Sequence, residues 1–412
     1  MNPNQKNRKI QWYGNDGGDD WIYYYRPHAP SSKSDQGEIY HMNIPSPCYV
    51  LDEEKLVRNL KIIDRIQKEA DVQIILALKG FSMWGVFPVI RRYVNGATAS
   101  SLNEVRLCNE ELGAKSHTYC VAYDSNDFND IASQSSCITF NSLSQYDCFV
   151  DRVPPNVSIG LRVNPEWSDV KTELYNPASP TSRLGVTSKN LLELPKQVEG
   201  LHFHMLCESS SFALEKVLRV FEERFGRFIP KLKWINMGGG HSMTREDYDV
   251  VHLISLLKTF KKKHQLEIIL EPGSAFVWQT GDLYTTILDI VENGHKKTAI
   301  FDGSFTCHMP DCLEMPYRPE LGNGSESKLD GWHPYRLGGV SCLAGDFLED
   351  YWFEKPLEVG DSLIFKDMMH YTMVKTSTFN GVNHPSIGMI RCDRTFELIR
   401  SFEYSDFKNR LS

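Results

Sequence analysis

Short apolar runs alternate with segments of helical periodicity between residues 72 and 270, and this alternation limits the possible folds more than any other feature. The first run, Val72–Leu78, is apolar at nearly every position, which favours a parallel strand buried on both faces. Asp52 is a candidate N-cap for a preceding helix over Glu53–Ala70. Seven further strands are predicted at Gly96–Ala99, Thr118–Ala122, Cys137–Phe140, Ser158–Val163, Leu201–Met205, Trp234–Met237 and Glu267–Leu270.

Eight such strands with helices between them predict a (β/α)₈ barrel of the TIM type, with a doubly wound open sheet as the alternative. The expected helices include Asn103–Leu112, Phe212–Phe225 and Arg245–Lys262. After about residue 295, strand-like runs alternate with Gly and Pro turns, which predicts a β-rich domain. Its candidate strands are Thr298–Phe301, Ser362–Phe365 and Tyr371–Val374. We therefore expect a polar extension (residues 1–44) with an aromatic patch at Trp21–Tyr25, a barrel domain (residues 45–295) and a C-terminal β domain (residues 296–412).

The composition excludes several classes of protein. With 41% hydrophobic residues the chain can bury enough surface to fold, which excludes disorder for most of it. The net charge of −8 argues against a nucleic-acid partner that is bound through its phosphates. No apolar run is long enough for a membrane span, and the N-terminus has no apolar signal segment. Ten cysteines without CxxC spacing suggest reduced thiols, so we expect a cytoplasmic protein.

Four features lie at the ends of predicted strands or directly after them: Lys79, His204, the triglycine Gly238–Gly240, and Glu271. In a barrel, the carboxyl ends of the strands share one mouth, where catalytic residues lie. Each feature also has an ordinary explanation, such as a solvated lysine, a structural histidine or a simple turn. His202 and His204 could form a metal pair, but no third ligand stands out, and we expect no metal. The triglycine lacks the G-x-G-x-x-G spacing of a NAD site.

Taken together, the four features match the chemistry of one ligand. A lysine in a partly dry pocket can form a Schiff base with an aldehyde. Glycines let backbone N–H groups approach a phosphate, an imidazole can stack on a flat ring, and a carboxylate can pair with a ring nitrogen. Pyridoxal 5′-phosphate (PLP) has all four groups, and it acts as an electron sink for carbanions. The sequence therefore predicts a PLP site.

Longer motifs point to a family. The barrel contains Ala77–Lys79, Ala97–Glu104, Leu161–Pro165, Ser182–Gly185, His202–Glu208 and Gly238–His241, and the second domain contains Cys307–Asp311, Leu313–Pro319, Cys342–Asp346 and His370–Lys375. With these motifs, residues 45–390 resemble the fold-type III (alanine-racemase-like) PLP-dependent decarboxylases. The Cys-His-Met-Pro-Asp and Leu-Glu-Met-Pro-Tyr-Arg-Pro stretches resemble the carboxynorspermidine/carboxyspermidine decarboxylase branch, which implies release of CO₂ to form norspermidine or spermidine in polyamine biosynthesis.

The resemblance also implies roles for single residues. Lys79 would form the Schiff base, His204 would stack on the pyridine ring, and Glu271 would pair with its nitrogen. Cys342 would protonate the reacting carbon in the partner subunit, which implies a homodimer with shared sites. Phosphate contacts are implied for Gly238, Gly239, Gly240, Gly273 and Tyr371, and supporting positions near the ring and His204 for Arg162 and Glu104.

A polyamine substrate gives acidic residues a use, because each distal ammonium group needs a carboxylate partner. We expect Asp311 first and Asp346 second to take this part; the other candidates are Glu314, Glu208 and Arg318. Ser274 stands where related decarboxylases have a charged residue after Glu-Pro-Gly, and it remains a candidate substrate neighbour. The alternatives are a diaminopimelate or ornithine decarboxylase, an amino-acid racemase, and a binding homologue without activity. The preference between carboxynorspermidine and carboxyspermidine stays open.

Overall fold

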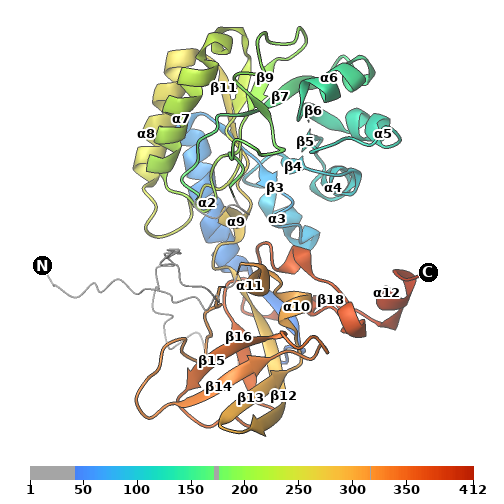
Figure 1. The fold of residues 1–412 in the computed structure, drawn as a ribbon, viewed down its shortest axis with the longest axis vertical. Helices are drawn as coiled ribbons and strands as arrows, with labels where there is room; N and C mark the ends of the chain where they lie inside the picture. The colour runs from blue at the N-terminus through green and yellow to red at the C-terminus, as the bar shows by residue number, and fades with distance from the viewer. Residues whose placement is uncertain (1–41, 171–175, 316) are drawn as a thin grey trace, which may run out of the picture.

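The computed structural model describes residues 42–170, 176–315 and 317–412, and a parallel barrel and a second, mixed sheet dominate it (Figure 1). Neighbouring barrel strands pair in parallel, and Gln73–Ala77 acts as one strand interrupted at Ile75. Its first part pairs with the last strand and its second part with the next strand, which closes the ring. The strands in ring order are β2 (Gln73–Ile74) with β3 (Leu76–Ala77), β4 (Ala97–Ala99), β5 (Ser116–Tyr119), β6 (Ser135–Phe140), β7 (Ser158–Asn164), β9 (Gly200–His202), β10 (Trp234–Asn236) and β11 (Glu267–Leu270); the short β8 (Val186–Thr187) pairs with β7. The eight predicted strand positions and the barrel are confirmed, and the open sheet is wrong.

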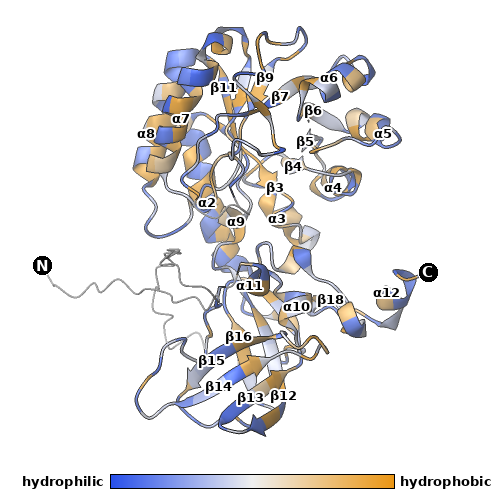
Figure 2. Ribbon diagram, viewed as in Figure 1, coloured by the Kyte–Doolittle hydropathy of each residue, from blue (hydrophilic) through white to orange (hydrophobic). Residues whose placement is uncertain are grey.

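Amphipathic helices connect the barrel strands and bury their apolar faces. In α2 (Glu53–Ala70), the Asp52 side chain accepts the Lys55 N–H at 3.1 Å, as the predicted N-cap should, and Leu56 and Ile63 are fully buried. Blue and orange stretches alternate along α2, α7 and α8 in Figure 2. The remaining helices of this part are α3 (Phe87–Ile90), α4 (Leu102–Leu107, continued as a π-helix over Cys108–Leu112), α5 (Phe128–Ser133), α6 (Leu143–Phe149), α7 (Ser211–Phe225), α8 (Val250–His264) and α9 (Ser274–Val277). Helix α8 begins five residues later than predicted, after the Asp249 N-cap.

The second sheet combines both ends of the described chain. Strand β1 (Cys48–Asp52) pairs antiparallel with β12 (Gly281–Asn293) and parallel with β17 (Ser386–Ile390). The sheet has the order β15-β14-β13-β12-β1-β17-β18, with β16 also on β12; the other strands are β13 (Lys296–Phe301), β14 (His333–Gly338), β15 (Phe347–Phe353), β16 (Ser362–Phe365) and β18 (Phe396–Arg400). The sheets thus do not follow the predicted division at residue 295, because β1 and β12 belong to the second sheet. The short helices α10 (Phe305–His308), α11 (Asp311–Glu314) and α12 (Tyr404–Asn409) complete this part.

Two further predictions have different outcomes. The predicted strand Tyr371–Val374 is wrong: Tyr371 has a φ of +50°, and a 3₁₀ turn follows at Met373–Lys375. Nearly all of the predicted extension, with Trp21–Tyr25, lies outside the described residues. Within the described part of the chain, no helix has the length and apolar character that crossing a membrane requires.

Buried histidines make the fold sensitive to acid. Burial lowers the pKa of His117, His241 and His308 from 6.5 to about 4. Between these values the unfolded chain binds protons that the folded chain does not, so the free energy of unfolding falls as pH drops from 6.5 towards 4. Each such shift corresponds to about 3 kcal/mol. We expect urea denaturation to show this loss between about pH 7 and pH 4, and a smaller loss in His117→Gln; a variant with the wild-type pH slope would contradict the assignment.

Candidate active site at the carboxyl ends of the barrel strands

Lys79 lies two residues after the end of β3, and its side chain is solvent-accessible although protein surrounds it. Desolvation by this surrounding protein lowers the Lys79 pKa below its usual value of 10.5, and the Arg162 guanidinium lowers it further. The carboxylates of Glu271 and Glu104 oppose the shift, so both lie close enough to act on this amine. An accessible amine with a lowered pKa is the form of lysine that can attack an aldehyde.

The His204 imidazole is held as a neutral ring. Its Nδ1 accepts the Gly239 N–H at 2.9 Å, so the proton of the neutral ring is on Nε2. Burial holds the His204 pKa well below 6.5, and the positive charges of Lys79 and Arg162 act in the same direction. A neutral imidazole beside the Lys79 amine is suited to stacking on an aromatic ligand.

Glu271 directly follows β11 and is 7% exposed. Its Oε1 accepts a hydrogen bond of 2.6 Å from Asn236 Nδ2, and its Oε2 lies 3.6 Å from His202 Nε2. Burial raises the Glu271 pKa, whereas the Asn236 hydrogen bond and the charge of Lys79 favour the carboxylate. The structure therefore brings Glu271 together with Lys79 at one end of the barrel, as predicted.

Arg162 and Glu104 lie around this centre. Arg162, on β7, is 5% exposed, and its guanidinium lies 4.6 Å from the centre of the Tyr119 ring. The Tyr119 hydroxyl donates to Asn141 Oδ1 at 2.7 Å, which fixes the ring beneath the guanidinium. The Glu104 carboxylate accepts the Ser100 N–H at 2.6 Å at the start of α4. Both predicted supporting residues thus lie within electrostatic reach of Lys79.

The triglycine turn requires glycine for steric reasons. A Cβ on Gly240, whose φ is +83°, would lie 2.0 Å from the Leu206 carbonyl oxygen. Two of the turn's N–H groups are used within the protein, because Gly238 donates to Asn236 Oδ1 at 2.9 Å and Gly239 donates to His204. The N–H groups of Gly238 and Gly239 therefore already have partners, and Gly240 is the best candidate of the three glycines to bind phosphate through its N–H.

Gly273 and Tyr371 lie against the loop that follows Lys79. A Cβ on Gly273 would lie 3.2 Å from the Gly80 Cα, so the two backbones pack closely. The Tyr371 N–H donates to the Gly80 carbonyl at 2.8 Å, which joins the C-terminal part of the chain to this loop. Ser274 is the first residue of α9, beside Gly273.

The predicted acids of the C-terminal part have partners within the protein. Lys375 Nζ lies 2.7 Å from Glu314 Oε2 and also forms an ion pair with Asp311. Burial would lower the Lys375 pKa, but its hydrogen bonds to the two acids outweigh burial and raise it. A substrate ammonium group at this pair would have to compete with Lys375.

Asp346 is 4% exposed and accepts bonds from the Ser304 hydroxyl (2.8 Å), the Ser341 hydroxyl (2.6 Å) and the Thr306 N–H (3.0 Å). These contacts satisfy Asp346 within the protein and anchor the loop that holds Cys342, so a substrate ammonium group would have to compete with them.

Cys342, Arg318 and Glu208 complete the set of predicted residues. Cys342 is exposed, and its N–H donates to Asn380 Oδ1 at 2.8 Å. Arg318 stacks 4.2 Å from the centre of the Tyr351 ring and donates to backbone carbonyls, so its guanidinium already has partners within the protein. Glu208 follows β9 in the loop after His204 and has a φ of +49°.

Three polar residues beneath this site were not predicted from the sequence: Asn236, His202 as a neighbour of Glu271, and Tyr119. Asn236 and His202 are the last residues of β10 and β9, where a polar side chain in an otherwise apolar strand is the available signal. The Tyr119 ring packs edge-on against His202, with 5.5 Å between the ring centres. Among the described residues, no group of three or more His, Cys, Asp or Glu side chains could hold a metal ion.

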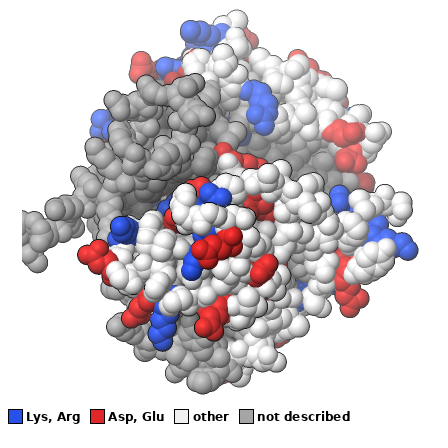
Figure 3. Space-filling model, turned by 60° about the horizontal axis from the view of Figure 1, so that its bottom comes forward, with Lys and Arg blue, Asp and Glu red and all other residues white. Residues whose placement is uncertain are grey.

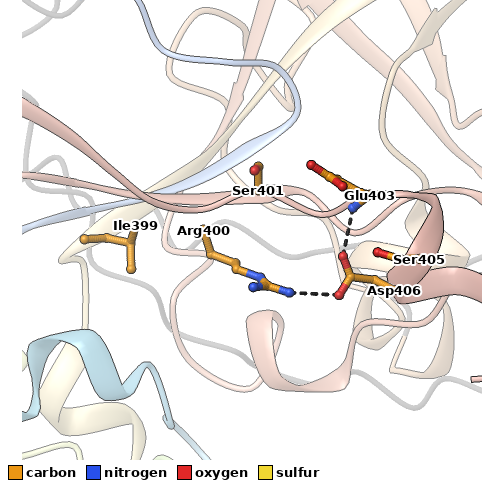
Figure 4. A pocket seen from close by; sticks show the side chains of 6 residues that line it. All are labelled: Ile399, Arg400, Ser401, Glu403, Ser405 and Asp406. Atoms are coloured by element: carbon orange, nitrogen blue, oxygen red, sulfur yellow. Dashed lines mark hydrogen bonds and ion pairs between the residues drawn. The ribbon is translucent and has the colours of Figure 1, made fainter. Parts of the chain in front are cut away.

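A separate hollow of about 400 Å³ lies near the C-terminus. It is lined by Ile399, Arg400, Ser401, Glu403, Ser405 and Asp406 (Figure 4). It contains the Arg400–Asp406 ion pair and none of the predicted site residues. The face in Figure 3 shows basic and acidic side chains interspersed, without an extended patch of one sign. The barrel mouth is therefore the candidate site.

The residues at the mouth fit PLP. An accessible lysine of lowered pKa, a neutral imidazole, a buried carboxylate and a turn that only glycine can form converge there. Fold and site together define a PLP-binding barrel enzyme.

The comparisons with known proteins agree. Residues 54–278 match the family described as pyridoxal-dependent decarboxylase, pyridoxal binding domain. A carboxyaminopropylagmatine decarboxylase from Synechocystis sp. is 50% identical over 90% of this chain and 96% of its own length. A carboxynorspermidine/carboxyspermidine decarboxylase from Campylobacter jejuni is 40% identical over 90% of this chain and 100% of its own. The crystal structure of carboxynorspermidine decarboxylase complexed with norspermidine from Campylobacter jejuni has a TM-score of 0.84 at 39% identity, over 89% of this chain and 100% of that one. The chain belongs to the pyridoxal-dependent decarboxylases.

Proposed function

We propose that this protein removes CO₂ from the α-amino carboxylate end of a carboxylated polyamine, carboxynorspermidine or carboxyspermidine. The observation that carries the proposal is the convergence of Lys79, His204 and Glu271 at one end of the barrel. Two similar proteins that align with 90% of this chain are named for carboxylated polyamine substrates. They support such a substrate over diaminopimelate or ornithine, and decarboxylation over racemisation.

Each of these residues has a task that its surroundings explain. PLP, when bound, supplies an electron sink for the bond pair that CO₂ leaves behind. Lys79 would hold the cofactor aldehyde through its neutral amine, which the lowered pKa makes available. Glu271, as a carboxylate, would hold the proton on the ring nitrogen, and the neutral His204 ring would stack on the cofactor. Gly240, Gly273 and the Tyr371 hydroxyl would hold the phosphate.

We propose Cys342 as the proton donor in the site of a second subunit, so that the protein works as a homodimer. Its exposure and its Gly-rich loop, held by Asp346, support this role. In Cys342→Ala we expect the cofactor absorbance to remain and kcat to fall about 100-fold, the lower range for loss of an acid–base group. The exposed Cys148→Ala is the matched control and should keep full activity. Wild-type turnover in Cys342→Ala would overturn the assignment.

The shared site can be tested by mixing subunits. If Lys79 and Cys342 of one site come from different chains, a mixed dimer of Lys79→Ala and Cys342→Ala contains one intact site. An equal mixture exchanged at random should recover about a quarter of the wild-type activity. No recovery, with mixed dimers demonstrated by mass, would place both residues in one chain's site.

A second substrate is favoured by one observation: the relative that is 50% identical is named for carboxyaminopropylagmatine. This substrate would end in a guanidinium group where carboxynorspermidine ends in a primary ammonium. The Asp311–Glu314 pair, which holds Lys375, has the charge to bind either cation.

The deciding experiment is CO₂ release from carboxynorspermidine, carboxyspermidine, carboxyaminopropylagmatine, diaminopimelate and ornithine. We expect the highest kcat/KM on a carboxylated polyamine, and a difference of about 10- to 200-fold at most between substrates that differ by one methylene. No CO₂ from any of these polyamines, with the cofactor band intact, would reject the proposal. All ten cysteines are free thiols, which supports a reducing compartment, and we propose the cytoplasm.

A further inference from the structure

Asn236 connects two parts of the candidate site through a single side chain. It is the last residue of β10 and is 3% exposed. Its Oδ1 accepts the Gly238 N–H at 2.9 Å, and its Nδ2 donates to Glu271 Oε1 at 2.6 Å. The first bond shapes the triglycine turn, and the second fixes the carboxylate that follows the next strand.

The two bonds determine which way the amide points. An N–H donor must face the carbonyl oxygen of the amide, so the amide nitrogen faces Glu271. An amide nitrogen can only donate, and a carboxylate without a proton can only accept. Asn236 therefore favours the ionised form of Glu271 in a place where burial disfavours it.

A second link runs through the backbone. The Glu271 N–H donates to the Gly238 carbonyl at 2.8 Å, and the neighbouring Gly239 N–H donates to His204 Nδ1. Glu271, the turn and the imidazole thus form one connected unit with Asn236 at its centre.

The ionisable groups around Glu271 come from several strands. His202 on β9 lies 3.6 Å from Oε2, and Lys79 after β3 and Arg162 on β7 act on Glu271 as positive charges. Cys137 on β6 lies close enough to Glu271 that the negative charge of Glu271 raises the pKa of the Cys137 thiol. Among these described neighbours of Glu271, Asn236 is distinguished by its side-chain hydrogen bond to the triglycine turn.

We propose that Asn236 is a positioning residue that keeps Glu271 ionised and aligned with the phosphate-binding turn, so that one amide sets the distance between the two ends of the cofactor site. The inference rests on the proposed function, because it takes Glu271 as the partner of the ring nitrogen.

The test compares Asn236→Asp and Asn236→Leu. Aspartate keeps the acceptor for Gly238 but faces Glu271 with a second carboxylate; leucine removes both bonds. Asn164→Asp is a matched control: Asn164 is fully buried, accepts the Glu166 N–H at 2.7 Å two residues on, and donates to the Ser179 carbonyl instead of a carboxylate. Each apoprotein is titrated with PLP and with pyridoxal by tryptophan fluorescence, and the cofactor absorbance is followed against pH.

Two carboxylates in contact share one proton, so we expect Asn236→Asp to show an added titration step in the absorbance that wild type and Asn164→Asp lack. Its preference for PLP over pyridoxal should stay near wild type, because the turn keeps its bond. Asn236→Leu should bind PLP about tenfold more weakly or worse and lose much of that preference.

Three results would overturn the inference. The first is a wild-type pH profile in Asn236→Asp with cofactor bound, and the second is the same added step in Asn164→Asp. The third is an unchanged preference for PLP over pyridoxal in Asn236→Leu. If Asn236→Leu does not fold, the comparison of the two aspartate variants still decides. Failure of the proposed function would look different, because wild type would then release no CO₂ from the carboxylated polyamines, whereas the cofactor titrations and pH profiles of the variants use no substrate.

Discussion

Replacing Lys79 by alanine is expected to remove the visible absorption band of the cofactor and nearly all activity. Lys79 is the accessible amine at the barrel mouth, with a pKa that its surroundings lower, and the cofactor aldehyde then has no lysine to bind. Losing a covalent anchor that acts together with the other site groups should cost about 10⁴-fold or more in kcat. The spectrum, borohydride trapping of the cofactor on the protein, and CO₂ release measure these effects.

The control for this variant is Lys115→Ala, which removes an exposed lysine that donates to the Ser133 carbonyl. It should keep the spectrum and the activity. If Lys79→Ala retained the band, or if borohydride fixed the cofactor on another lysine, the proposed anchor would be wrong.

The second large effect is expected for Glu271→Gln. The amide has nearly the shape of the carboxylate, but it cannot stabilise a proton on the ring nitrogen by charge. We expect the cofactor to stay bound and kcat to fall about 10²- to 10³-fold, the range for removing one preorganised electrostatic group. Saturation kinetics and the cofactor spectrum, measured on the same preparation, separate the loss of kcat from loss of cofactor.

Glu267→Gln is the matched control, because Glu267 lies at the other end of the same strand and forms an exposed ion pair with Lys261. An exposed pair of this kind contributes at most about 1 kcal/mol to stability and nothing to the site. A kcat in Glu271→Gln close to that of Glu267→Gln would remove Glu271 from the mechanism.

The positions of Lys79 and Glu271 could be predicted from the sequence because they depend on one rule. A polar residue that directly follows an apolar strand lies at the mouth of a (β/α)₈ barrel, and no other contact has to be known to place these two residues there. Asn236 depends on two partners that come later in the chain, Gly238 and Glu271, and no local pattern indicates that its two bonds form together.

In the C-terminal part, contacts between distant segments determine two features that local sequence does not indicate. Tyr371–Val374 has β-forming residues, but the Tyr371 backbone turns with a positive φ and donates to Gly80. Asp346 is buried because Ser304 and Ser341, far from each other in the sequence, supply hydroxyl donors to its carboxylate. Neither outcome can be deduced without knowing which distant segments meet.

The place of β1 has a consequence for biosynthesis. Cys48 pairs with Tyr284 on one side and Ser386 on the other, so this strand emerges from the ribosome about 340 residues before its second neighbour. At roughly 5–20 residues per second, the delay is on the order of tens of seconds. The barrel strands are complete by Leu270 and can close during translation. Until β17 is synthesised, one edge of the apolar strand β1 stays unpaired. Nascent chains stalled before residue 386 should therefore depend on chaperones far more than finished ones.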